Sequence, residues 1–165
     1  MPSPAAPLVW NDSLLLGDPE MDAVHEEFVA CIAALIQADE SGVAAALAAL
    51  EHHAIGHFEM EDTWMRENDF PARGCHIDEH AAVLASIAGV RRRVADGETS
   101  AAYEIAQALS DWFPGHADYL DSALAHWMCK RRWGGKPVVL RRGVAAGSDD
   151  ASDDSDALAA VRRSS

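Results

Sequence analysis

The strongest constraint on the fold of this chain is a regular seam of mostly apolar residues between residues 43 and 64. Its members recur at alternating intervals of four and three residues: Val43, Leu47, Leu50, Ala54, His57, Glu61 and Trp64. This spacing places them all on one face of an α-helix, and a face of this length predicts a helix that packs against others in a bundle. The seam is unusual at His57 and Glu61, because ionisable residues are rarely placed where a helix faces a core.

Three further stretches show the same helical periodicity. Almost no part of the chain shows the alternation of apolar and polar residues that is typical of a β-strand. The first helix should begin near Pro19, with Asp18 as its N-cap, and stop before Gly42. The others are expected over about 43–68, 76–94 and 100–132. Short connections favour antiparallel neighbours, so the predicted fold class is all-α, an up-down-up-down four-helix bundle.

The composition changes after Trp133. Residues 130–142 hold six basic residues and no acid, and a stretch rich in Gly, Ser and Asp follows. This part has too few large apolar residues to add to a core. We therefore expect residues 1–133 to form the bundle and residues 134–165 to form a flexible, low-complexity tail.

The charge of the chain excludes some classes of partner. Thirteen Lys and Arg stand against 27 Asp and Glu, a formal net charge of -14, which repels phosphate backbones and anionic lipids. Nucleic acid is therefore not an expected partner. No apolar run reaches the roughly 18 residues of a membrane span. The first ten residues lack signal-peptide features, and three scattered cysteines fit no disulfide framework. We expect a cytoplasmic location.

Each predicted helix carries residues that can bind metal on its inward face. Together they are five histidines and two carboxylates: His25, His57, Glu61, His76, His80, His116 and Asp121. Two pairs on the second and third helices are four residues apart, so each pair shares one helical face. Burying so many ionisable groups costs several kcal/mol unless they are paired or bind metal. The pattern therefore predicts a buried metal site.

The residue types in this set favour iron. Seven ligands exceed the four that one zinc ion takes, whereas two ions that share bridging carboxylates accommodate them. An imidazole-rich set without thiolates suits iron, and all-oxygen sets would suit magnesium or calcium. Cys75 is expected to be free, because it points about 100° away from its neighbour His76 on a helix. Two iron ions are the favoured assignment.

Four stretches match one family pattern in combination. They are the opening from Trp10 to His25 with Gly17 and Asp22, HFEMEDTWM at 57–65, FPARGCHIDEH at 70–80, and His116 with Asp121 five residues later. Over roughly residues 8–133, this combination resembles the bacterial hemerythrins.

The resemblance implies two iron ions joined by an oxo or hydroxo bridge, with dioxygen as their ligand. The implied ligands are His76, His80 and His116 for one iron, His25 and His57 for the other, and Glu61 and Asp121 as bridges. The iron with two histidines would keep an open position. Phe28 and Trp112 are the expected walls of the dioxygen pocket.

The chain departs from the family pattern around the ligands. Val24 stands where a glutamine commonly precedes the first ligand, Asp62 replaces a glutamate, and His53 occupies a position where an aromatic residue is common. None is an expected ligand, so the departures bear on dioxygen affinity and autoxidation. His53 either fills the seam or supports a ligand.

The fourth helix should be irregular near its ligands. Residues five apart lie about 140° apart on an ideal α-helix, so His116 and Asp121 would point in different directions. Pro114 also removes a backbone hydrogen bond. A wide turn, a kink or a π-bulge between residues 114 and 121 is therefore expected.

These observations favour reversible dioxygen binding by a carrier, store or delivery protein over an enzyme. Five neutral imidazoles and two carboxylates leave a reduced two-iron centre net positive, unlike the carboxylate-rich sets of ferritin-like oxidases. The alternatives are a dioxygen or redox sensor that signals through the basic segment, and a di-iron oxidase. The sequence does not identify a protein partner.

Overall fold

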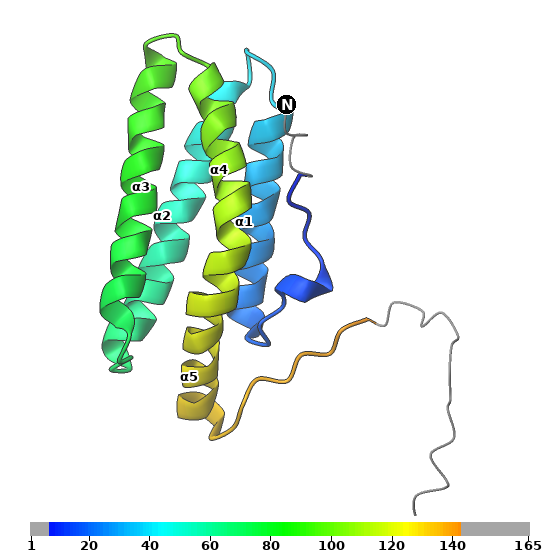
Figure 1. Cartoon of the computed structure of the whole chain (residues 1–165), viewed down its shortest axis with the longest axis vertical. Helices are drawn as coiled ribbons and strands as arrows, with labels where there is room; N and C mark the ends of the chain where they lie inside the picture. Colours follow the sequence, from blue (N-terminus) through cyan, green and yellow to red (C-terminus); the bar gives the residue numbers. More distant parts are fainter. Residues whose placement is uncertain (1–6, 143–165) are drawn as a thin grey trace, which may run out of the picture.

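The predicted fold class is confirmed by the computed structural model, which describes residues 7–142. These residues form helices and no strand, in the order α1 (Pro19–Gln37), α2 (Val43–Glu67), α3 (Arg73–Ala95), α4 (Ser100–His116) and α5 (Ser122–Trp133). The chain runs up α1, down α2, up α3 and down α4 and α5, so neighbouring helices are antiparallel (Figure 1). Helix α1 packs against α2 and α4, and α3 packs against the same two helices.

The start of α1 is fixed by side chains that accept backbone hydrogen bonds. Asp18 is the N-cap and accepts from the N–H groups of Glu20 and Met21, as expected. Asp22 accepts from the backbone N–H groups of Leu16 and Gly17, at 2.8 and 3.0 Å. These bonds tie the segment before the bundle to the first turn of α1, one turn before His25.

Two apolar clusters lie on either side of the middle of the bundle. The large apolar cluster joins residues of α1 and α2, including Phe28, Ile32, Leu47, Leu50 and Phe58, to residues of α3 and α4. The small apolar cluster lies toward the other end and comprises Met21, Met65, Phe70, Leu124, Ala125 and Met128. The predicted metal-ligating residues lie along the helices between these two clusters.

The expected irregularity in the fourth helix is confirmed. Between α4 and α5, residues Ala117–Asp121 form a π-helical turn, and Pro114 lies just before it within α4. The wider turn adds a residue to the helical repeat, so it changes the direction of every side chain that follows. Helix α5 then ends at Gly134, which adopts a left-handed conformation with φ of 72°.

The segment after α5 passes along the segment before α1. Gly17 has φ of 89°, and a Cβ placed there would come within 2.8 Å of Pro137. Asp12 accepts a hydrogen bond of 2.7 Å from the backbone N–H of Arg142. The remainder of the expected tail, residues 143–165, lies outside the described residues, as do residues 1–6.

Candidate metal centre

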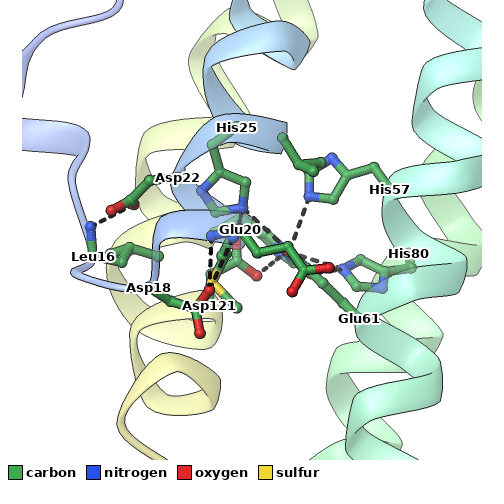
Figure 2. Close-up of polar contacts among 12 residues, drawn as sticks. Leu16, Asp18, Glu20, Asp22, His25, His57, Glu61, His80 and Asp121 are labelled. Carbon is green, nitrogen blue, oxygen red and sulfur yellow. Dashed lines mark hydrogen bonds and ion pairs between the residues drawn. The ribbon is translucent and has the colours of Figure 1, made fainter. Parts of the chain in front are cut away.

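The structure brings all seven predicted metal-ligating residues together in the middle of the bundle. They come from every long helix and are all buried, at 4% exposure or less: His25, His57, Glu61, His76, His80, His116 and Asp121. Figure 2 shows His25, His57, His80, Glu61 and Asp121 pointing toward one another from different helices. The predicted convergence of these residues is therefore observed.

Helical geometry explains how each helix contributes. His57 and Glu61 lie one turn apart on α2, as do His76 and His80 on α3. The π-helical turn between α4 and α5 carries Asp121 round to the face that His116 occupies, where Asp121 Oδ1 lies 3.0 Å from His116 Nε2. A regular α-helix would separate these two side chains by about 140°.

The two oxygens of Glu61 face different histidines. Oε1 lies 2.9 Å from His57 Nε2 and 3.2 Å from His25 Nε2. Oε2 lies 3.3 Å from His80 Nε2 and 3.6 Å from His76 Nε2. The carboxylate therefore presents one oxygen to the histidines of α1 and α2 and the other to those of α3.

Asp121 divides its oxygens in the same way. Oδ1 lies 2.9 Å from His76 Nε2 and 3.0 Å from His116 Nε2, while Oδ2 lies 3.2 Å from His25 Nε2. The donor atoms accordingly form two groups, one of Glu61, His76, His80, His116 and Asp121, and one of His25, His57 and Glu61. We call these the three-histidine half and the two-histidine half.

The donor atoms fit metal ions better than they fit one another. Glu61 Oε2, both oxygens of Asp121 and His76 Nε2 are buried without a hydrogen-bond partner among residues 7–142. Nε2 of His80 also lies 3.2 Å from Nε2 of His116. Two neutral imidazoles can place at most one proton between these two nitrogens. Buried polar atoms that converge without partners are costly, and a cation between them removes that cost.

Without metal, the same contacts shift pKa values. Burial alone would lower the pKa of His25, but the close carboxylates of Asp121 and Glu61, each 3.2 Å from Nε2, outweigh it and raise this pKa to about 9. The pKa of His76 is raised to about 9 for the same reasons. Burial would raise the pKa of Glu61, but the charge of His57 and hydrogen bonds from His25 and His57 hold it well below its ordinary value. Glu61 therefore stays anionic and can bind cations.

Aromatic rings enclose the two-histidine half more completely than the sequence indicated. Phe28 is fully buried, and its ring centroid lies 5.5 Å from that of His57. Phe113 lies edge-on to His25 at 5.1 Å, and Phe58 lies 4.9 Å from His57. Phe58 and Phe113 were not among the expected pocket walls. The position of Phe58 directly after His57, and of Phe113 three residues before His116, could have indicated them.

Trp112 and the remaining histidines lie around the ligands. Trp112, the other expected wall of the dioxygen pocket, packs on the ring of His116 at 4.3 Å and so lies beside the three-histidine half, whereas the open position is expected in the two-histidine half. His53 is half-buried, and its Nε2 lies 3.1 Å from the backbone oxygen of Val24, so it links α2 to α1. His52 and His126 are exposed. Cys75 is a free, exposed thiol, as predicted.

No helix within the described part of the chain is long and apolar enough to cross a membrane.

Comparisons with known proteins agree with the geometry. The model of the hemerythrin HHE cation-binding domain matches residues 16–127. A bacteriohemerythrin of Ralstonia nicotianae is 38% identical over 122 residues, which cover 74% of this chain and 89% of that protein. A myohemerythrin of Riftia pachyptila is 27% identical over 116 residues, which cover 70% of this chain and 89% of that protein. The span that the family model matches contains all seven predicted metal-ligating residues.

Proposed function

The chain belongs to the hemerythrin family of di-iron oxygen-binding proteins, and from this premise we propose that it binds dioxygen reversibly as a carrier, store or delivery protein. The site is proposed to be a non-haem di-iron centre. Its proposed ligands are His76, His80 and His116 for one iron, His25 and His57 for the other, and Glu61 and Asp121 as bridges.

The observation that carries this proposal is the division of each carboxylate between the two halves. Glu61 and Asp121 each direct one oxygen to the three-histidine half and the other to the two-histidine half. A single ion would use one side of each carboxylate and leave the opposite oxygens buried and unpaired. Two ions use both sides, which is the arrangement of a bridged dinuclear site.

When bound, the two irons would together supply the electrons that hold dioxygen, and they would regain those electrons when dioxygen leaves. The protein's contribution is to bind, orient and shield. The two-histidine half offers fewer ligands than the three-histidine half, so an iron held there would have room for a further ligand. Phe28, Phe58 and Phe113 pack against the imidazoles of this half and would limit the access of water on that side. Water exclusion would slow autoxidation, in which dioxygen leaves in a reduced form and the irons remain oxidised.

The ligand set also supports binding over turnover. Neutral imidazoles outnumber carboxylates, so the reduced centre carries net positive charge. Such a set favours the lower oxidation states of iron and disfavours oxidation of an organic substrate, and we propose on this basis that the protein is not an enzyme.

Optical spectroscopy tests the proposed function. The reduced protein should be nearly colourless, gain a charge-transfer band under air and lose it again under argon over repeated cycles. Steady consumption of dioxygen with a reductant and an added organic substrate, at rates typical of enzymes, would contradict it.

A further inference from the structure

The two halves of the centre differ in what holds the far nitrogen of each imidazole. A histidine that binds metal through Nε2 carries its proton on Nδ1, and a partner at Nδ1 fixes the ring and makes it a stronger ligand. The chain provides such partners unevenly.

In the three-histidine half, Asp62 holds His80. Asp62 Oδ1 lies 2.7 Å from His80 Nδ1, and the Asp62 side chain is largely buried. The ring of Phe58 stacks on the other side, 4.1 Å from His80 and 7° from parallel. His80 is therefore held with its Nε2 toward the centre.

Glu79 supports His116 in the same half. Its Oε1 accepts a 2.8 Å hydrogen bond from Trp112 Nε1, and its Oε2 lies 3.4 Å from His116 Nδ1. Trp112 in turn packs on the ring of His116. The carboxylate and the indole thus restrict His116 from two directions.

The two-histidine half has no comparable support among residues 7–142. Nδ1 of His25 and Nδ1 of His57 are both buried without a hydrogen-bond partner there. His57 also lines a surface pocket of about 380 Å³ between α1 and α2, together with His53 and Gly56. Nδ1 of His76 and Nδ1 of His116 also lack a hydrogen-bond partner among the described residues. The contrast therefore rests mainly on the hydrogen bond between Asp62 and His80, and secondly on the Glu79 carboxylate 3.4 Å from His116 Nδ1.

We propose that the two halves hold metal with unequal affinity, the three-histidine half loading first and releasing last, and that Asp62 and Glu79 are positioning residues that set this order. The inference rests on the proposed di-iron function. It follows from the larger ligand set of one half and from the carboxylates of Asp62 and Glu79, which lie beside Nδ1 of two of its three imidazoles.

The test uses the full-length, iron-loaded protein, reduced under argon and challenged with a chromophoric ferrous chelator. Iron should leave in two phases of equal amplitude, the second at least tenfold slower. Proton NMR locates the remaining ion, because each imidazole bound to iron gives a shifted, exchangeable N–H signal. Three such signals should remain after the first phase. Two remaining signals, or release of both ions in one phase, would overturn the proposal.

Variants test the two positioning residues. Asp62→Asn and Glu79→Gln should each accelerate the slow phase by about 10- to 100-fold, the usual effect of losing such a partner, and leave the fast phase nearly unchanged. Asp78→Asn is the matched control, because Asp78 is an exposed neighbour of Glu79 on α3. A slow phase equally affected by Asp78→Asn, or unaffected by both other variants, would contradict these roles.

Failure of this inference is distinguishable from failure of the proposed function. Two irons released in the opposite order, or together, would refute the inference and leave the di-iron assignment in place. The order of release in the unmodified protein also decides the proposal if a variant fails to fold.

Discussion

The buried face of α2 changes character halfway along the helix. Leu47 and Leu50 on one part, and His57 and Glu61 on the other, are all at 3% exposure or less. Burial of the leucines removes apolar surface from water, and this burial stabilises the fold. The histidine and the glutamate lose their hydration and regain stability through the groups that they bind.

The comparison shows that one helix can carry stability and chemistry in separate segments. Side chains alone complete the packing of the large apolar cluster, whereas the donor atoms of the proposed metal centre have unpaired positions that ions would complete. Substitutions in the first segment should therefore change the free energy of unfolding, and substitutions in the second should change the metal content.

The largest effect is expected from Glu61→Gln. The amide keeps the volume of the side chain but removes the charge that bridges both halves, so iron per folded chain should fall at least tenfold. Elemental analysis of the folded protein measures this. Glu59→Gln, at an exposed position on the same helix, is the control and should retain its iron. Retention of both irons by Glu61→Gln would contradict the bridging role.

Leu50→Ala tests the apolar segment of the buried face of α2. Leu50 is fully buried in the large apolar cluster, so its truncation should lower the free energy of unfolding by about 2–5 kcal/mol. The Leu50→Ala protein that remains folded should keep its iron. Denaturant titration and iron analysis together measure both quantities, and a loss of iron as severe as that of Glu61→Gln would show that the segments are not separable.

Much of this division could be predicted from the sequence, because helical spacing fixes which residues share a face. His57 and Glu61 follow Leu50 and Ala54 at the same intervals, so their burial was predictable. The spacing of His116 and Asp121, with Pro114 nearby, also indicated the irregular turn that the structure shows as Ala117–Asp121.

The contacts around the ligands were less predictable. The pairing of Asp62 with His80, and of Glu79 with Trp112, depends on the rotation of neighbouring helices, which the sequence of one helix does not specify. Phe113 was missed for a similar reason, since an aromatic residue in an apolar stripe is consistent with any part of the core. The contacts of Arg142 with Asp12 join residues far apart in the chain and had no local signal.

Phe28→Leu should have a smaller effect on stability and a distinct effect on function. Losing part of the ring removes apolar contact worth about 1 kcal/mol and admits water beside His57. Autoxidation, followed as decay of the charge-transfer band under air, should become several-fold faster. Phe70→Leu, in the small apolar cluster, controls for the loss of an aromatic ring. Equal autoxidation rates in the two variants would contradict a shielding role for Phe28.

The smallest effect is expected from deletion of residues 134–165. The deletion removes the exposed contact between Arg142 and Asp12, and exposed ion pairs contribute little to stability. Iron content should be unchanged and the melting temperature should shift by about 2 °C or less. Deletion of residues 143–165 alone is the matched control. A fall of many degrees in the longer deletion would show that residues 134–142 are part of the packed domain.

The iron content of the purified protein tests the bridged centre most directly. If Glu61 and Asp121 each serve both halves, protein expressed in iron-replete medium should contain about two irons per chain, and Glu61→Gln should lose both together. A ratio near one iron per chain, or zinc as the tightly held metal, would contradict the account.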